Sequence, residues 1–452
     1  MSQGQEAFTA LHPTSPRDGV GRRPGPFRWL SRGAQRRLAA ESGLKILSID
    51  PTYSLELIRE RGLEHEITCR DLDGFFEHVW TVHPVVGASW EHSRSTAFGL
   101  PTFTPIAPRH TMVEGHIGLF PMPAPLAAIN LAFAQMTLLV SLVKLVRREG
   151  IAAIRAGDPY YSGLFGLLLA RLNGLPLVIR INANYDLLYR TTGELAYPRL
   201  LRSRKVEMRV ASFVLKRADL TVAGSKDNLR YAVDNGADLK KSTLFPNGTW
   251  IDPIHFQQEP STRPSVRDEL GLGDRPFVAL VSRLSLVKHP EDVIYTLAHA
   301  KRSHPKLAAV FIGDGPMRGE LERLATELGV AEDVIFAGNR NQQWLASALA
   351  DANVVLSPLT GRALVEACLS STPVVAYDVE WHSEFLRSGE NGILVPYRDT
   401  EAMATAVCQL LADPQLGERL GRAGRATAIE VMNPALLMEH ERREYKKLLG
   451  LQ

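Results

Sequence analysis

Two cations stand close together beside a predicted helix start. Arg283 follows the apolar run Phe277–Val281, and Lys288 comes directly before His289-Pro290 and an acidic first turn. A proline near the first helical position and acidic residues after it are typical of a helix N-terminus. A guanidinium can bind two phosphate oxygens at once, while an ammonium acts as a point charge. The pair is therefore a candidate pyrophosphate site that would stabilise charge on a departing diphosphate; exposed loop cations are the alternative.

A second anion site is expected at a helix start further along the chain. The apolar run Val354–Leu356 leads into a Ser-Pro-Leu-Thr-Gly turn, and the pattern predicts a helix over Arg362–Leu369. The N–H groups of Gly361, Arg362 and Ala363 precede the first intrahelical bonds, so they can bind a phosphate.

Glu366 lies about one and a half turns into this helix, where a carboxylate can accept hydrogen bonds from both hydroxyls of a ribose. Its neighbours are apolar, so the helix is predicted to be buried, and an unpaired carboxylate is costly there. This favours nucleotide binding over the alternative of a surface glutamate.

A glycine turn, Gly313-Asp314-Gly315, follows the apolar run Ala308–Ile312. Glycine permits a tight turn and a close approach of backbone to a ligand. The next glycine is Gly319, so the spacing is not that of a dinucleotide fingerprint. An ordinary strand-to-helix turn is the default interpretation.

These residues require a framework of alternating strands and helices. Short apolar runs predict strands at Lys45–Ile49, Ile151–Arg155, Leu177–Ile181, Leu220–Ala223, Ser242–Phe245, Phe277–Val281, Ala308–Ile312, Val334–Ala337, Val354–Leu356, Val374–Ala376 and Ile393–Val395. Amphipathic stretches lie between them, and this alternation predicts parallel sheets with helices on both faces. The polar, proline-containing stretch from Trp250 to about Arg275 is the expected domain boundary.

The expected fold class is therefore α/β, with two doubly wound, Rossmann-like domains facing a cleft. We place the N-terminal domain at 44–252 and the C-terminal domain at 253–434. A predicted amphipathic helix within 435–452 is a candidate to complete the N-terminal domain. Residues 1–43 are rich in Pro, Gly, Ser and Arg and are interpreted as a disordered basic tail, either without a role or contacting anionic lipid.

Composition narrows the function classes. The 452-residue chain has a net charge of +3, which gives no reason to propose nucleic-acid binding. Its three cysteines fit neither a disulfide framework nor a zinc site, and they suggest a reducing cytoplasm. The uncharged run Ile117–Val143 is long enough to span a bilayer, but prolines and polar residues interrupt it. A buried helix over Leu126–Arg148 is favoured, and interfacial attachment stays open.

The combined motifs resemble retaining glycosyltransferase family 4, which has the GT-B fold. The resemblance covers roughly Phe277 to Leu411 and rests on SRLSLVKHPED, FIGDGPMRGELERLATELGVAEDVIFAG, GRALVEACLSSTPVVAYD and GENGILV. Looser similarity in the first half lies in DPYYSGLFGLLLARLNGLPLV, ADLTVAGSKDNLRYAVDNGA and FPNGTWIDPIHF.

The resemblance implies that Arg283 and Lys288 bind the donor diphosphate and that Glu366 binds the donor ribose; these three are the candidate catalytic residues. The further residues expected around the donor are Gly313, Asp314, Gly361, Arg362, Ala363, Leu364 and Glu384. It also implies retention of anomeric configuration, a nucleoside-diphosphate sugar as substrate, no cofactor and no bound metal.

The chain departs from the family pattern chiefly on the acceptor side. The first glutamate of the family's paired motif has no equivalent, and Thr360 sits near its place. Trp381-His382 stands where a glycine pair is common, and Asn182 stands where a histidine is common. The acceptor-side candidates are Asp158, Asn182 and Tyr185, expected at the carboxyl ends of adjacent strands. Loop capping by Asp158 and Asn182 is the alternative.

Three functions follow. The first is a glycosyltransferase that builds a cell-surface polysaccharide or glycolipid, cytoplasmic or peripheral at the inner membrane face, with a glycan or glycolipid acceptor. The second is an epimerase or hydrolase acting on the nucleotide sugar itself. The third is a catalytically weak scaffold subunit that binds nucleotide sugar.

Overall fold

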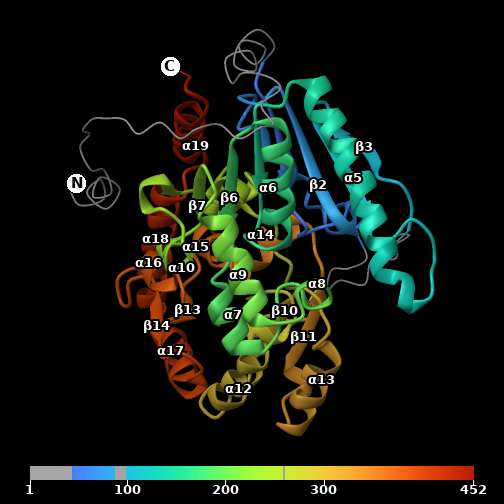
Figure 1. Ribbon diagram of the computed structural model, residues 1–452. Coiled ribbons are helices and arrows are strands. Elements are labelled where there is room, and N and C mark those ends of the chain that lie inside the picture. The colour runs from blue at the N-terminus through green and yellow to red at the C-terminus, as the bar shows by residue number, and fades with distance from the viewer. Residues whose placement is uncertain (1–42, 87–97, 258–259, 452) are drawn as a thin grey trace.

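The computed structural model describes residues 43–86, 98–257 and 260–451 of the chain. All but Gly43 of the basic tail expected at the N-terminus lies outside these residues. Two sheets form the framework, and Figure 1 shows them with helices packed on both sides. This confirms the expected α/β architecture of two doubly wound domains.

The N-terminal sheet has the strand order β3-β4-β2-β1-β5-β6-β7-β8. All its neighbouring strands pair in parallel except β3 with β4, which pair antiparallel. The strands are β1 (Lys45–Ile49), β2 (His78–Val86), β3 (Thr102–Ala107), β4 (His110–His116), β5 (Ala153–Ala156), β6 (Leu177–Ile181), β7 (Leu220–Ala223) and β8 (Ser242–Leu244).

The C-terminal sheet is parallel throughout, in the order β11-β10-β9-β12-β13-β14. Its strands are β9 (Phe277–Val281), β10 (Ala308–Ile312), β11 (Val334–Gly338), β12 (Val354–Ser357), β13 (Val374–Tyr377) and β14 (Ile393–Val395). Each one lies within a residue of its predicted bounds, because these strands appear in the sequence as short uninterrupted apolar runs.

Helices cover both sheets. Those of the N-terminal half are α3 (Leu55–Arg61), α4 (Glu64–Thr68), α5 (Ala127–Glu149), α6 (Tyr161–Asn173), α7 (Tyr185–Thr192), α8 (Pro198–Leu201), α9 (Arg204–Leu215) and α10 (Lys226–Asp234). Those that follow are α11 (Ile254–Gln257), α12 (Glu291–Ala300), α13 (Arg318–Glu327), α14 (Gln342–Asp351), α15 (Ala363–Leu369), α16 (His382–Phe385), α17 (Thr400–Ala412), α18 (Pro414–Val431) and α19 (Pro434–Leu449).

The right-handed crossover rule assigns helices to the two faces of the N-terminal sheet. The connections through α5, α6 and α9 all advance along the sheet in one direction, so these helices share a face. Their apolar residues form one core cluster with Leu47, Ile49 and Ile179. The intervening strand residues, such as Ile46 and Val178, point to the other face and pack with Tyr445 of α19.

The last helix therefore returns from the C-terminal domain to close the N-terminal core. Tyr445 is fully buried, and its ring meets those of Phe76 and Phe245 edge-on or tilted. Glu441 lies one turn earlier, 2% exposed, with the buried guanidiniums of Arg155 and Arg180 as its charged neighbours. Burial raises the pKa of the Glu441 carboxyl and lowers that of Arg180 to about 10.

We predict that Glu441→Gln lowers the free energy of unfolding by about 1–3 kcal/mol, because it removes the carboxylate that partly offsets the buried charges of Arg155 and Arg180. Urea unfolding followed by circular dichroism measures the change. Glu439→Gln is the matched control, since Glu439 is an exposed residue of the same helix, and it should shift stability by less than about 0.5 kcal/mol. Equal midpoints for the two variants would contradict the account of the helix.

Candidate functional site

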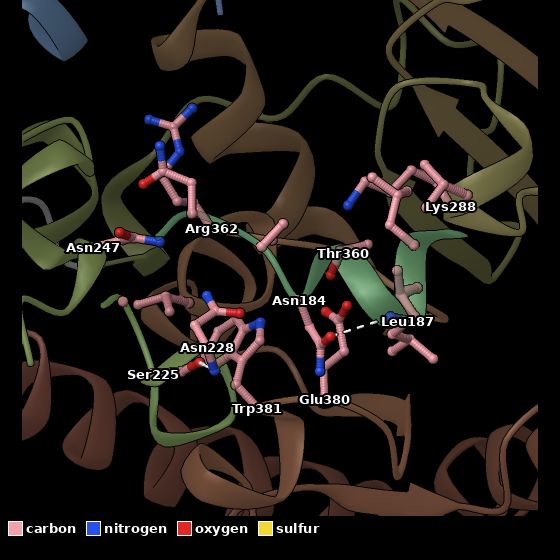
Figure 2. A pocket seen from close by; sticks show the side chains of 18 of the residues that line it. Asn184, Leu187, Ser225, Asn228, Asn247, Lys288, Thr360, Arg362, Glu380 and Trp381 are labelled. Atoms are coloured by element: carbon pink, nitrogen blue, oxygen red, sulfur yellow. Dashed lines mark hydrogen bonds between the residues drawn. The ribbon is translucent and has the colours of Figure 1, made fainter. Parts of the chain in front are cut away.

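A pocket lies between the carboxyl edges of the two sheets. Its walls come from the segments that follow β6, β7 and β8 on one side and β9, β12 and β13 on the other. Its lining residues include Asn182, Asn184, Ser225, Asn228, Asn247, Arg283, Lys288, Thr360, Gly361, Arg362, Glu380 and Trp381. The cavity volume is about 230 Å³. Of the residues expected from the sequence, the pocket thus brings together Arg283, Lys288, Gly361, Arg362 and Asn182. Figure 2 labels Lys288 and Arg362 among the residues that line it.

The two cations reach the pocket on a turn that follows β9. Lys288 ends a short 3-10 turn, and His289 after it adopts a left-handed backbone with φ of 50°. His289 is buried, and its Nε2 lies 2.7 Å from the hydroxyl of Tyr397. Burial lowers the pKa of Lys288; the Glu380 carboxylate opposes that shift, and Arg283 adds to it. A second negative charge would therefore be favourable beside these cations.

The glycine turn supports this cation turn from behind. A Cβ added at Gly313 would lie 2.1 Å from the Ser282 carbonyl oxygen, and one at Gly315 would lie 2.3 Å from that of Leu284. The Leu284 N–H donates to the Asp314 carbonyl oxygen over 3.1 Å. Gly313 and Asp314 do not line the pocket. The backbone of this glycine turn therefore closely approaches a neighbouring loop of the protein, and not a ligand in the pocket.

Arg362 lines the pocket but directs its guanidinium to the other domain. It forms an ion pair with Glu66 of α4 and donates to the carbonyl oxygen of Trp250 over 2.9 Å. The Glu66 carboxylate raises the pKa of Arg362 against the effect of its burial. The side chain therefore joins the two domains, while the adjacent Gly361 stays exposed at the pocket wall.

Three other residues of the same segment lie beneath the pocket wall. Leu364 is fully buried in the domain core, and Glu366 is 6% exposed on α15. Neither residue lines the pocket, and nor does Ala363. The ribose role of Glu366 remains a prediction.

Glu384 also lies away from the pocket and makes a contact between domains. Its two carboxylate oxygens accept hydrogen bonds of 2.8 and 2.7 Å from the backbone N–H groups of Lys226 and Asp227. These groups open α10, where a negative charge is favourable. Since Ser225 and Asn228 at this helix start line the pocket, Glu384 fixes one wall relative to the other.

Among the acceptor-side candidates, Asn182 alone faces the pocket. It accepts from Arg180 Nε and donates to the Gly157 carbonyl oxygen, both over 3.1 Å. Asp158 is 4% exposed, accepts from the Tyr197 hydroxyl over 2.7 Å, and has its pKa raised by burial. Tyr185 packs edge-on against Tyr160. These two side chains thus point into the domain, a correction to the expectation that all three face the cleft.

Glu380 is the main residue that sequence reasoning missed. It is the one acidic side chain among the described residues that line this pocket, and Figure 2 shows it near Lys288 and Thr360. Burial raises the pKa of its carboxyl, while Lys288 lowers it. Its φ of 50° is left-handed, a strained conformation that recurs at functional sites. The sequence did contain one indication of this residue, because the bulky Glu380-Trp381 pair stands close to where the family often has glycines.

Asparagines on the N-terminal wall were missed as well. Asn247 accepts from Arg180 over 2.7 Å, and the Arg180 guanidinium lies 4.0 Å from the centre of the Trp250 ring. Asn184 caps α7 and donates to Asp227 over 3.0 Å. Both asparagines are thus held in place by other groups. Within the described parts of the chain, no group of three His, Cys, Asp or Glu side chains is arranged to hold a metal ion.

Residues 262–427 match the family model of the glycosyl transferases group 1. The GDP-mannose-dependent alpha-(1-6)-phosphatidylinositol monomannoside mannosyltransferase of Mycolicibacterium smegmatis is 34% identical over 191 residues, which are 40% of this chain and 50% of that protein. The alpha-D-kanosaminyltransferase of Streptomyces kanamyceticus is 28% identical over 70% of this chain and 80% of its own length.

Solved structures agree in fold. HepE of Anabaena, in complex with UDP and glucose, has a TM-score of 0.66 at 20% identity over 89% of this chain and 100% of its own. The sucrose-phosphate synthase of Thermosynechococcus elongatus has a TM-score of 0.69 at 20% identity over 90% and 99%. Residues 262–427 are thus similar to the group 1 glycosyl transferases, and the two-domain fold of the whole chain is that of solved glycosyltransferase structures.

Proposed function

We propose that the chain is a retaining glycosyltransferase that moves a sugar from a nucleoside-diphosphate sugar to an acceptor hydroxyl, in glycolipid or polysaccharide synthesis. The observation that supports this proposal is the position of Arg283 and Lys288 at the carboxyl edge of the C-terminal sheet. Opposite them lie asparagines that follow strands of the N-terminal sheet. Parallel α/β sheets bind their ligands at this edge.

The charge distribution suits departure of a diphosphate. Breaking the bond between sugar and phosphate leaves negative charge on the leaving group, and fixed cations stabilise that charge as it develops. Lys288 already has a lowered pKa, so an anion bound beside it relieves a cost that exists in the empty pocket. In this proposal the cations perform the charge neutralisation, with no bound metal.

The remaining polar residues suit the transferred sugar. A carboxylate such as that of Glu380 can accept hydrogen bonds from two neighbouring sugar hydroxyls, and Trp381 beside it offers an apolar ring face. Asn182 and Asn247 line the opposite wall, where amides can bind further hydroxyls of the donor or the acceptor.

The relatives guide the choice of substrates. The mycobacterial relative is named as a GDP-mannose-dependent mannosyltransferase of phosphatidylinositol monomannoside, and the Streptomyces relative as a kanosaminyltransferase. The chain spans about half the length of the first relative. We therefore propose a hexose or amino-hexose donor, with a lipid-linked or small glycoside as the acceptor.

Incubation with a panel of nucleotide sugars, with and without membrane lipid extract, tests the function. The proposal expects sugar transfer only when the extract is present. Donor turnover without any acceptor would instead indicate an epimerase or hydrolase, and tight nucleotide binding without turnover would indicate a scaffold subunit.

We predict that Arg283→Ala and Lys288→Ala each weaken UDP or GDP binding about 10- to 100-fold, because each removes a charge-assisted hydrogen bond worth about 1.5–3 kcal/mol. Isothermal titration calorimetry measures the affinity. Arg302→Ala removes an exposed cation outside the pocket and serves as the control. Wild-type affinity in both pocket variants would rule out this diphosphate site.

We predict that Glu380→Gln separates sugar recognition from nucleotide recognition. The value of kcat/KM for the nucleotide sugar should fall about 10- to 100-fold, while UDP or GDP affinity stays within about threefold of wild type. Exposed Glu390→Gln is the matched control. Equal losses for the free nucleotide and for the nucleotide sugar would place Glu380 outside the sugar subsite.

The Glu380→Gln variant should also shift the pH dependence of donor binding. Lys288 binds a diphosphate in its charged form, which is lost as pH rises through its pKa. The Glu380 carboxylate raises that pKa, so its removal lowers the pKa further and moves the alkaline limit of donor binding to lower pH. A profile unchanged in Glu380→Gln would show that the two side chains do not interact.

A further inference from the structure

One face of the N-terminal domain exposes a continuous apolar surface. Along α5 the exposed side chains are Ile129, Phe133, Met136 and Val140, spaced four, three and four residues apart, so they form a single stripe. Phe133 is 60% exposed and Met136 is 58% exposed. Large apolar side chains are normally buried, and a continuous exposed patch of them marks an interaction site.

The neighbouring helices extend this surface. α6 packs beside α5, and α9 packs beside α6, over one face of the sheet (Figure 1). α6 exposes Leu164, Leu168 and Leu172, and α9 exposes Val206, Met208 and Phe213. We call the exposed side chains of these three helices the α5–α6–α9 face.

The exposed charges of the α5–α6–α9 face have one sign. They are Lys144, Arg147, Arg148, Arg171, Lys205 and Arg209. The carboxylates of these helices are paired: Glu149 lies 3.5 Å from Lys45 and 2.9 Å from Arg148, and the buried Glu207 lies 3.1 Å from Arg204. The stripe of α5 itself passes from apolar side chains to Lys144 and Arg147 in its last turns.

The opposite side of α5 packs in the core of the N-terminal domain. The helix is long and apolar enough to cross a membrane by length and composition. Yet Leu138 and Leu142 of this helix are fully buried. They pack in one core cluster with residues of strands that precede the helix in the chain and of strands that follow it. Spanning a bilayer would remove these residues from the core, so the helix can meet a membrane only with its exposed stripe.

We propose that the α5–α6–α9 face docks on the surface of a membrane that contains anionic phospholipids. Apolar side chains enter the interface between headgroups and acyl chains, and the cations contact the phosphates. A second copy of this chain fits less well, because a twofold interface would bring cations of the two copies together.

Co-sedimentation with vesicles tests the proposal without donor or acceptor, so its outcome is independent of the transferase activity. The full chain should bind vesicles with roughly one-third phosphatidylglycerol about tenfold more tightly than pure phosphatidylcholine vesicles. Phe133→Ser with Met136→Ser should weaken binding to the anionic vesicles about tenfold, and Lys144→Glu with Arg147→Glu should remove the lipid preference.

Matched controls lie on the other domain and on the C-terminal helix. Arg302→Glu with Lys306→Glu reverses two exposed cations, and Leu436→Ser removes an exposed apolar side chain. Both should bind the anionic vesicles like wild type. All variants retain residues 1–42, so any contribution of that segment is constant, and equal thermal midpoints check the fold.

Three results would overturn the proposal. One is wild-type protein that stays unbound with anionic vesicles, and another is unchanged binding in both variants of the face. The third is a concentration-dependent dimer in sedimentation equilibrium that the apolar variant abolishes, which would assign the face to a second copy.

Discussion

The carboxyl edges of the two sheets meet at the pocket, and the contacts that hold the domains together there position its two walls relative to each other. Helix α19 leaves the C-terminal domain and buries Tyr445 in the N-terminal core. Arg362 reaches Glu66, and Glu384 holds the start of α10, both across the domain boundary. A cavity of about 230 Å³ lies below the roughly 300–1,000 Å³ of most small-molecule pockets. The contacts of Arg362 and Glu384 hold the two walls of this small cavity in their present arrangement.

Within the pocket, charge balance decides what can bind. Among the described residues that line the pocket, Glu380 supplies the one carboxylate opposite Lys288 and Arg283, and burial lowers the pKa of Lys288. In the proposed function, a diphosphate beside the two cations completes the balance and places the donor sugar next to the carboxylate. The surrounding structure keeps these groups in place, since the glycine turn supports Arg283 from behind and His289 anchors the end of the Lys288 turn.

The sequence predicted the framework better than it predicted the directions of side chains. The C-terminal strands were found closely because they are unbroken apolar runs. Strand β2 was missed, since His78, His83 and Pro84 interrupt its apolar pattern, and the β3–β4 pair was missed beside it. Arg283 and Lys288 line the pocket as the local pattern of strand, cation and helix start led us to expect, and their diphosphate role stays a prediction.

Residues whose partners are distant could not be placed in this way. Glu66 lies 296 positions from Arg362, and Lys226 lies 158 positions from Glu384. No local pattern indicates that these side chains join the domains. Asp158 and Tyr185 do follow strands, yet the partners that draw them inward, Tyr197 and Tyr160, were not visible as such. Glu380 became visible as a site residue only when the structure placed it opposite Lys288.

The most direct test of the central claim is a crystal structure of the chain with bound UDP or GDP. The account predicts that the diphosphate lies within hydrogen-bond distance of both Arg283 and Lys288, at the carboxyl edge of the C-terminal sheet. A nucleotide bound elsewhere, or one whose diphosphate touches neither side chain, would contradict it.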